Sequence, residues 1–209
     1  MFHYPQYRHT DPQAIRQLVD RFPLALLTTL ADGQWHSSHV PLFLNDDNTE
    51  LFGHVDVSNG QFQCADGLSV QVVFAGPNAY IPPEAYATRQ LPTWNYLSAH
   101  ITGTLTLVND TQQKIAILSE TACRLNGHPG AFRIDHSDER IHRWIGSIRG
   151  LKIRVLSQEG RFKLSQDKSP EDTRAAAEHF SRVVAQQVTP DLLMSFSRTS
   201  PSSTPTPTP

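Results

Sequence analysis

The chain has 209 residues, a formal net charge of −2 and 38 % apolar residues. A chain of this length buries a core without disulfides or metal ions and suits one medium-sized domain. The charge gives no support to direct DNA binding, because a protein that holds phosphates through its own surface usually carries a net basic patch.

The sequence predicts a cytoplasmic protein without membrane contact. No run approaches the roughly 18 apolar residues of a membrane span. The first residues, Met1 to Pro5, lack the charged and apolar regions of a signal peptide. Cys64 and Cys123 do not form a CxxC motif. We therefore expect both to be buried free thiols in a reducing compartment.

The first half of the chain predicts a helix followed by strands. Asp11 is a suitable cap and Pro12 a suitable first residue for a helix over residues 11–22. Gly103 marks a bulge or a barrel corner in the longest strand. Strands are predicted over residues 24–30, 35–44, 51–55, 69–75 and 93–108, and a short helix over residues 58–65.

The second half mixes helices with a hairpin. Helices are predicted over residues 111–125, 137–145 and 169–187, and the first and third have caps at Asp110 and Ser169. Residues 151–156 and 161–164 are predicted to pair as a hairpin across residues 157–160.

The C-terminal part is predicted to contain a short helix followed by a disordered tail. A further helix over residues 191–197 would form a helix-turn-helix with the preceding one, but it is short and carries only Arg198 near its end. We expect one domain over residues 1–197 and a disordered Pro/Ser/Thr tail over residues 198–209.

The order of the elements predicts an α+β fold. Strands joined by hairpins, with helices inserted between them, favour an antiparallel barrel with peripheral helices. The chain lacks the alternating βαβ pattern with a Gly-rich phosphate loop, so a Rossmann fold is not expected.

Several strings are too polar for ordinary core strands, and together they resemble a known family. They are residues 37–41, 53–54, 58–61, 74–82, 91–96 and 160–166. In this order and spacing they resemble the PaiB family, over about residues 1–185. The strings Gly-Pro-x-Ala-Tyr-Ile, Pro-Thr-Trp-Asn-Tyr and Lys-Leu-Ser-Gln are the most specific.

The resemblance implies both a fold and a function. PaiB proteins are FMN-binding negative transcriptional regulators, related to the pyridoxamine phosphate oxidases. The expected fold is therefore an antiparallel split β-barrel of the FMN-binding type. The expected assembly is a homodimer with FMN in a groove between its subunits.

The resemblance also implies which residues bind the cofactor. Those expected beside the flavin ring are Ser38, His39, Val40 and Pro41, with a further contact at His54 and Val55. Those expected at the phosphate are Ser58, Asn59 and Gln61, where a helix start would offer free N–H groups. Those expected where the partner subunit approaches are Trp94, Asn95 and Tyr96, and the last motif adds Lys163, Ser165 and Gln166.

One departure concerns charge at the phosphate. Phosphate oxidases use Arg and Lys there, whereas residues 58–61 carry no charge. Either a remote basic residue such as Arg149, Lys152 or Lys163 supplies it, or FMN binding is weak.

Other functions rank below the flavin-binding regulator. His36 and His39 are spaced like helical metal ligands, but in a strand they face opposite sides, so no metal site is expected. The chain has no G-x-S-x-G motif, and no catalytic residue is assigned. The alternatives are a flavin-dependent oxidoreductase acting on a small molecule and a haem-binding or haem-degrading split-barrel protein. In an enzyme, the flavin would carry the chemistry.

Overall fold

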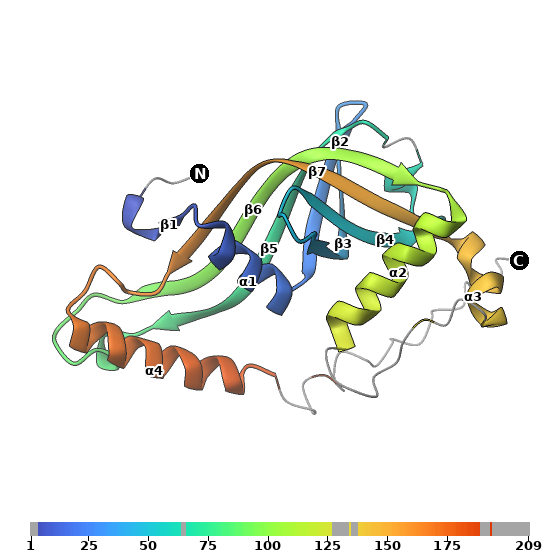
Figure 1. The fold of residues 1–209 in the computed structure, drawn as a ribbon. Helices are drawn as coiled ribbons and strands as arrows, with labels where there is room; N and C mark the ends of the chain where they lie inside the picture. The colour runs from blue at the N-terminus through green and yellow to red at the C-terminus, as the bar shows by residue number, and fades with distance from the viewer. Residues whose placement is uncertain (1–3, 64–65, 127–133, 135–137, 189–192, 194–209) are drawn as a thin grey trace, which may run out of the picture.

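The computed structural model describes residues 4–63, 66–126, 134, 138–188 and 193. Within them the strands form a seven-stranded antiparallel sheet in the order β1-β7-β4-β3-β2-β5-β6 (Figure 1). Because β6 also pairs with β7, strands β2 to β7 close into a barrel, as expected for a split barrel. The strands are β1 (Arg8–His9), β2 (Leu24–Ala31), β3 (Gln34–Leu44), β4 (Glu50–Asp56), β5 (Ser69–Ile81), β6 (Thr93–Val108) and β7 (Ile148–Lys163).

Helices surround the barrel, in agreement with the predicted α+β class. The predicted caps are confirmed, because N–H groups of the first turns donate to the side chains of Asp11, Asp110 and Ser169. The α-helices are α1 (Pro12–Arg21), α2 (Thr111–Asn126), α3 (Glu139–Trp144) and α4 (Pro170–Gln186). The 3₁₀ turns are η1 (Pro5–Tyr7), η2 (Gly60–Phe62), η3 (Pro83–Ala85) and η4 (Ile145–Ser147).

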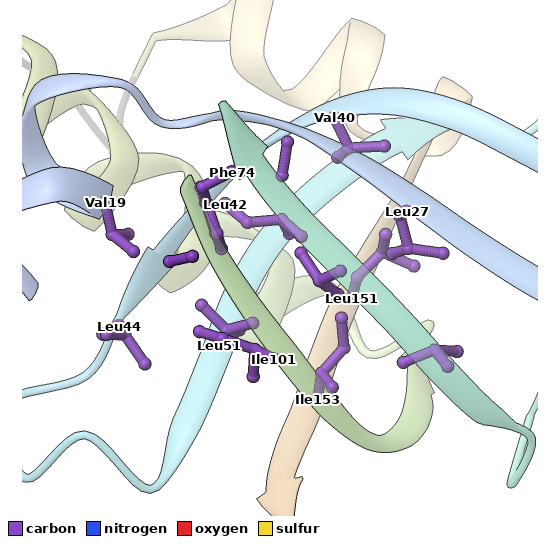
Figure 2. Packing of buried hydrophobic residues seen from close by; sticks show 14 of the residues in the cluster. Val19, Leu27, Val40, Leu42, Leu44, Leu51, Phe74, Ile101, Leu151 and Ile153 are labelled. Atoms are coloured by element: carbon purple, nitrogen blue, oxygen red, sulfur yellow. The ribbon is translucent and has the colours of Figure 1, made fainter. Parts of the chain in front are cut away.

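The main core fills the inside of the barrel. Alternate residues of each strand point inward, among them Leu27, Leu42 and Ile153, which have no exposed surface (Figure 2). Ile15 and Val19 of α1 belong to the same cluster. Each such side chain stabilises the fold by about 1.5–3 kcal/mol on burial.

Smaller clusters attach two helices to the outside. Phe43, Phe52 and Val108 pack with Ile117 of α2. Beyond the barrel, β5, β6 and β7 continue together as an arm, which we define as residues 78–81, 93–97 and 161–163 (Figure 1). Ile81 of this arm and Tyr86, which follows η3, pack with Ala176 of α4.

The predicted hairpin near residue 160 is wrong. Residues 157–160, which have the composition of a turn, pair with residues 99–102 of β6, so β7 runs unbroken. β5 likewise continues to Ile81 instead of ending at residue 75, with a register shift between Ala75 and Asn78. The irregularity predicted at Gly103 is confirmed by a register shift at that residue.

Other local predictions need correction or lie outside the described residues. The helix expected over residues 58–65 is, in the described part, a single 3₁₀ turn over residues 60–62. Cys123 is exposed, so its predicted burial is wrong, while Cys64 is outside the described residues. The predicted tail is also outside them, as is the helix over 191–197 apart from residue 193.

Candidate functional site

The predicted cofactor-binding residues form two groups. The residues predicted from β3, β4 and the turn after β4 lie together at one end of the barrel, and we call them the barrel group. Those predicted from β6 and β7 lie on or beside the arm, where Tyr96 is directly opposite Lys163, and we call them the arm group.

Hydrogen bonds fasten the η2 turn to the first strands of the barrel. Asn59 Nδ2 donates to Ser38 Oγ at 3.0 Å. Gln61 Nε2 donates to the carbonyl oxygens of Leu27 at 3.2 Å and His36 at 3.1 Å. The predicted phosphate segment therefore does meet the predicted ring segment.

The free helix start predicted for the phosphate is wrong. η2 is a single 3₁₀ turn, and the N–H groups of all three residues assigned to the phosphate already have acceptors, that of Asn59 being the Asp56 carbonyl at 3.1 Å. Ser58 donates its N–H and its hydroxyl to Asp56 Oδ1, at 2.8 and 2.6 Å. The N–H of Gln61 donates to Asn59 Oδ1 at 3.1 Å.

Positive charge reaches this turn from β7. Arg149 lies opposite Val55 in the sheet, and its Nη1 donates to the carbonyl oxygen of Phe62 in η2. Its Nε is buried and has no hydrogen-bond partner among the described residues. Of the three cations considered from the sequence, Lys152 pairs with Glu50 at 3.5 Å and Lys163 lies on the arm. The charge of Arg149 fits the phosphate of FMN.

The outer face of β3 offers exposed and half-buried polar groups. His39 is exposed and begins a cross-strand row that ends with His100 and Glu159. Burial lowers the pKa of the half-buried His54, and burial also lowers that of His100, against the opposing charge of Glu159. Both imidazoles are therefore neutral at pH 7 and able to donate or accept a hydrogen bond.

Two residues predicted to contact the flavin ring have side chains that point away from this outer face. Val40 and Val55 belong to the barrel core and are 1 % and 8 % exposed. Pro41, between Val40 and the core residue Leu42, is half-buried. A flavin on the outer face would meet the backbone of the two valines and not their side chains.

In the arm group, two buried side chains form hydrogen bonds within the chain. Asn95 and Ser165 are each 1 % exposed. Asn95 Nδ2 donates to Ser165 Oγ at 3.0 Å, and the Tyr86 hydroxyl lies 3.0 Å from the same oxygen. We missed Tyr86 in the sequence because no local signal places it beside residues so distant along the chain.

The other arm-group residues lie nearer the surface. Trp94 is 52 % exposed and Tyr96 36 %. Trp94 Nε1 donates to Asn78 Oδ1 at 3.2 Å, and Gln166 Nε2 donates to the Gln6 carbonyl at 3.2 Å. The exposed aromatic rings are the part of the arm most accessible to another molecule.

A closed antiparallel barrel whose polar η2 turn is bonded to a half-buried arginine fits a split-barrel flavoprotein. Residues 1–157 match the sequence model of the family described as "Putative FMN-binding domain". The chain therefore belongs to this FMN-binding family, and FMN is the cofactor that the family defines.

Relatives and solved structures agree with this placement. The chain is 27 % identical over 174 residues to the PaiB protein of Bacillus subtilis, "Protease synthase and sporulation protein PAI 2", covering 80 % of this chain and 84 % of that protein. The flavocytochrome Anf3 from Azotobacter vinelandii has a TM-score of 0.63 at 14 % identity, covering 84 % of this chain and 78 % of that one. The FAD and heme binding protein from Mycobacterium smegmatis has a TM-score of 0.61 at 15 % identity, covering 81 % and 80 %. The two structures confirm the fold.

The described residues hold neither a membrane-spanning helix nor a cluster of metal-binding side chains. No helix among them is both long and apolar enough to cross a membrane. No group of three or more His, Cys, Asp or Glu side chains in that part of the chain is arranged to hold a metal ion.

Proposed function

We propose that the protein is a cytoplasmic homodimer that binds FMN between its subunits and acts as a negative regulator of transcription. One observation carries the assembly: the barrel group and the arm group lie apart within a chain. A second copy that brings its arm to the outer face of β3 would complete a site from both groups.

In this proposal the barrel group holds most of the flavin. Arg149 supplies charge at the phosphate, while Asn59 and Gln61 keep the η2 turn in place through bonds to β3. His39 and His54 are polar groups for the ring. Bound FMN would supply one- or two-electron redox chemistry, which the side chains around it do not provide.

The partner's arm would cover the exposed side of the flavin. Trp94 and Tyr96 present rings that suit stacking on a planar group. Asn95 and Ser165 would act indirectly, by holding these rings through their buried hydrogen bonds.

The name of the relative supports a regulatory role, and the net charge of the chain favours an indirect route to DNA. The name of the Bacillus subtilis relative, "Protease synthase and sporulation protein PAI 2", refers to sporulation, a process under transcriptional control. A net charge of −2 argues against direct binding to DNA. We therefore propose that the flavin-loaded dimer acts through a protein partner.

The regulatory role is tested by transcript levels in a strain that lacks the gene. We expect a set of transcripts to rise on deletion and to return to normal with the wild type but not with Arg149→Gln. Unchanged transcripts, together with rapid reduction of the bound flavin by NADH or NADPH, would contradict the proposal and favour the oxidoreductase alternative. A salt-sensitive mobility shift of promoter DNA by the purified protein would contradict the indirect route.

A further inference from the structure

A cavity of about 440 Å³ lies on the arm, apart from the η2 turn. Its walls come from the N-terminal residues around η1, the start of β6, the end of β7 and the segment before α4. The N-terminal wall is fixed, because Arg161 Nη1 donates to the Tyr4 carbonyl at 3.2 Å and Gln166 Nε2 to the Gln6 carbonyl. The cavity is thus built by segments from both ends of the described chain.

The lining has an excess of positive charge. Two of its cations have carboxylate partners: Arg161 lies 3.1 Å from Glu159, and Lys168 lies 3.0 Å from Asp167. Lys163 does not: among the described residues no carboxylate lies within ion-pair distance of it.

The contacts that Lys163 makes are neutral. Its ammonium donates to the Thr93 hydroxyl and lies 5.8 Å from the centre of the Tyr7 ring. A half-buried ammonium with only neutral contacts is stabilised by an anion that enters the cavity.

The remaining walls suit a flat apolar group. Tyr4, Tyr7 and Tyr96 contribute aromatic rings, and Leu91 and Pro92 contribute apolar surface. Burial, with a hydrogen bond to Asp167, raises the pKa of Tyr7 to about 12. The Tyr7 ring therefore stays uncharged at neutral pH and adds no repulsion toward an anion.

We propose that this cavity binds a small planar molecule bearing one carboxylate or phosphate, with Lys163 as its counter-ion. The aromatic rings contact the flat part of the ligand, and the ammonium meets the anionic group. Tyr96, Lys163 and Ser165 line this cavity and also belong to the arm group, so the inference rests on the proposed function. It adds a second ligand beside the arm that covers the flavin, and it assigns Lys163 to that ligand and not to FMN.

Calorimetric titration of the FMN-saturated protein with benzoate and with phenyl phosphate tests the proposal. We expect at least one probe to bind saturably, while the neutral benzyl alcohol does not. Lys163→Met should lower the affinity for the bound probe at least tenfold, the loss expected when a charge-assisted contact is removed. The matched control is Lys152→Met on the same strand, whose ammonium pairs with Glu50 outside the cavity.

A second variant keeps the test informative if Lys163→Met does not fold. Leu91 is 83 % exposed at the cavity wall, so Leu91→Glu adds a negative charge there without disturbing the core. Leu91→Glu should lower the affinity for the anionic probe, because the two negative charges repel each other. The tighter probe identifies the carboxylate or the phosphate as the preferred group.

Three results would overturn the proposal. The first is no saturable binding of either anion in the millimolar range. The second is an equal loss of probe affinity in Lys163→Met and Lys152→Met. The third is a loss of FMN affinity in Lys163→Met as large as that for the probe, which would assign the cavity to the flavin.

Discussion

In the proposed site, Arg149 is the side chain on which FMN recognition should depend most. Replacing it with Gln removes the charge at the η2 turn and keeps a hydrogen-bonding group. A charge-assisted hydrogen bond contributes about 1.5–3 kcal/mol, so FMN affinity should fall about 10- to 100-fold. Fluorescence titration of flavin-free protein measures this directly.

Riboflavin provides the internal control, because it lacks the phosphate. Its affinity should change little in Arg149→Gln, and Lys152→Gln should change neither ligand, since Lys152 pairs with Glu50. Equal losses for FMN and riboflavin would show that Arg149 supports the fold of the site and does not recognise the phosphate.

Closure of the barrel between β6 and β7 depends on a glycine. A Cβ at Gly103 would lie 2.5 Å from the Arg154 carbonyl oxygen and 2.5 Å from Ile153 Cγ2. Gly103→Ala should therefore lower the free energy of unfolding by about 1–3 kcal/mol, the usual cost of overpacking. Gly146→Ala is the control, because nothing lies within 4 Å of its added Cβ. Urea unfolding that shows equal stability for both variants would contradict this role.

The contact between α4 and the loop that joins β5 to β6 should respond to pH. Asp172 is 1 % exposed and accepts hydrogen bonds from the N–H and hydroxyl of Thr88, at 2.8 and 2.7 Å. These bonds lower its pKa below the ordinary 3.8. Its stabilising contribution is therefore complete above about pH 4 and is lost as the pH falls through the lowered value.

Thermal unfolding between pH 6 and pH 3 tests this dependence. Asp172→Asn should unfold several degrees lower at pH 6 and lose less stability than the wild type on acidification. Parallel pH profiles for the two proteins would show that other carboxyl groups dominate the acid response.

Local signals predicted most elements but not the pairing of distant ones. The caps at Asp11, Asp110 and Ser169 depend on neighbouring residues, so the sequence shows them directly. The continuous β7 could not be predicted, because residues 157–160 look like a turn until β6 satisfies their backbone.

In the candidate site, too, local sequence predicted some features and the pairing of distant segments decided others. The barrel group follows from the family motifs, but the bonds from Asn59 to Ser38 and from Gln61 to Leu27 join residues 21 and 34 positions apart. The selection of Arg149 among three candidate cations required the pairing of β4 with β7, which no local pattern reveals. The bond between Tyr86 and Ser165 likewise joins residues 79 positions apart.

In the proposed dimer, the exposed apolar tip of the β2–β3 hairpin is a candidate contact between the two chains. Trp35 is 71 % exposed and lies directly opposite Leu30, which is 47 % exposed. If this hairpin tip contacts the second copy, Trp35→Lys should raise the dimer dissociation constant about 30-fold, the effect of losing a 2 kcal/mol anchor. Trp144→Lys is the control, since Trp144 is 62 % exposed on α3. Equal dimer stability of both variants in sedimentation equilibrium would remove the tip from the interface.

The most direct test of a flavin site shared between subunits is an FMN titration in which the molar mass is measured by light scattering at each point. We predict saturation at one FMN per chain on a dimer, and flavin loss when dilution produces monomers. A monomer that binds FMN with undiminished affinity, or a dimer that binds none, would contradict the account.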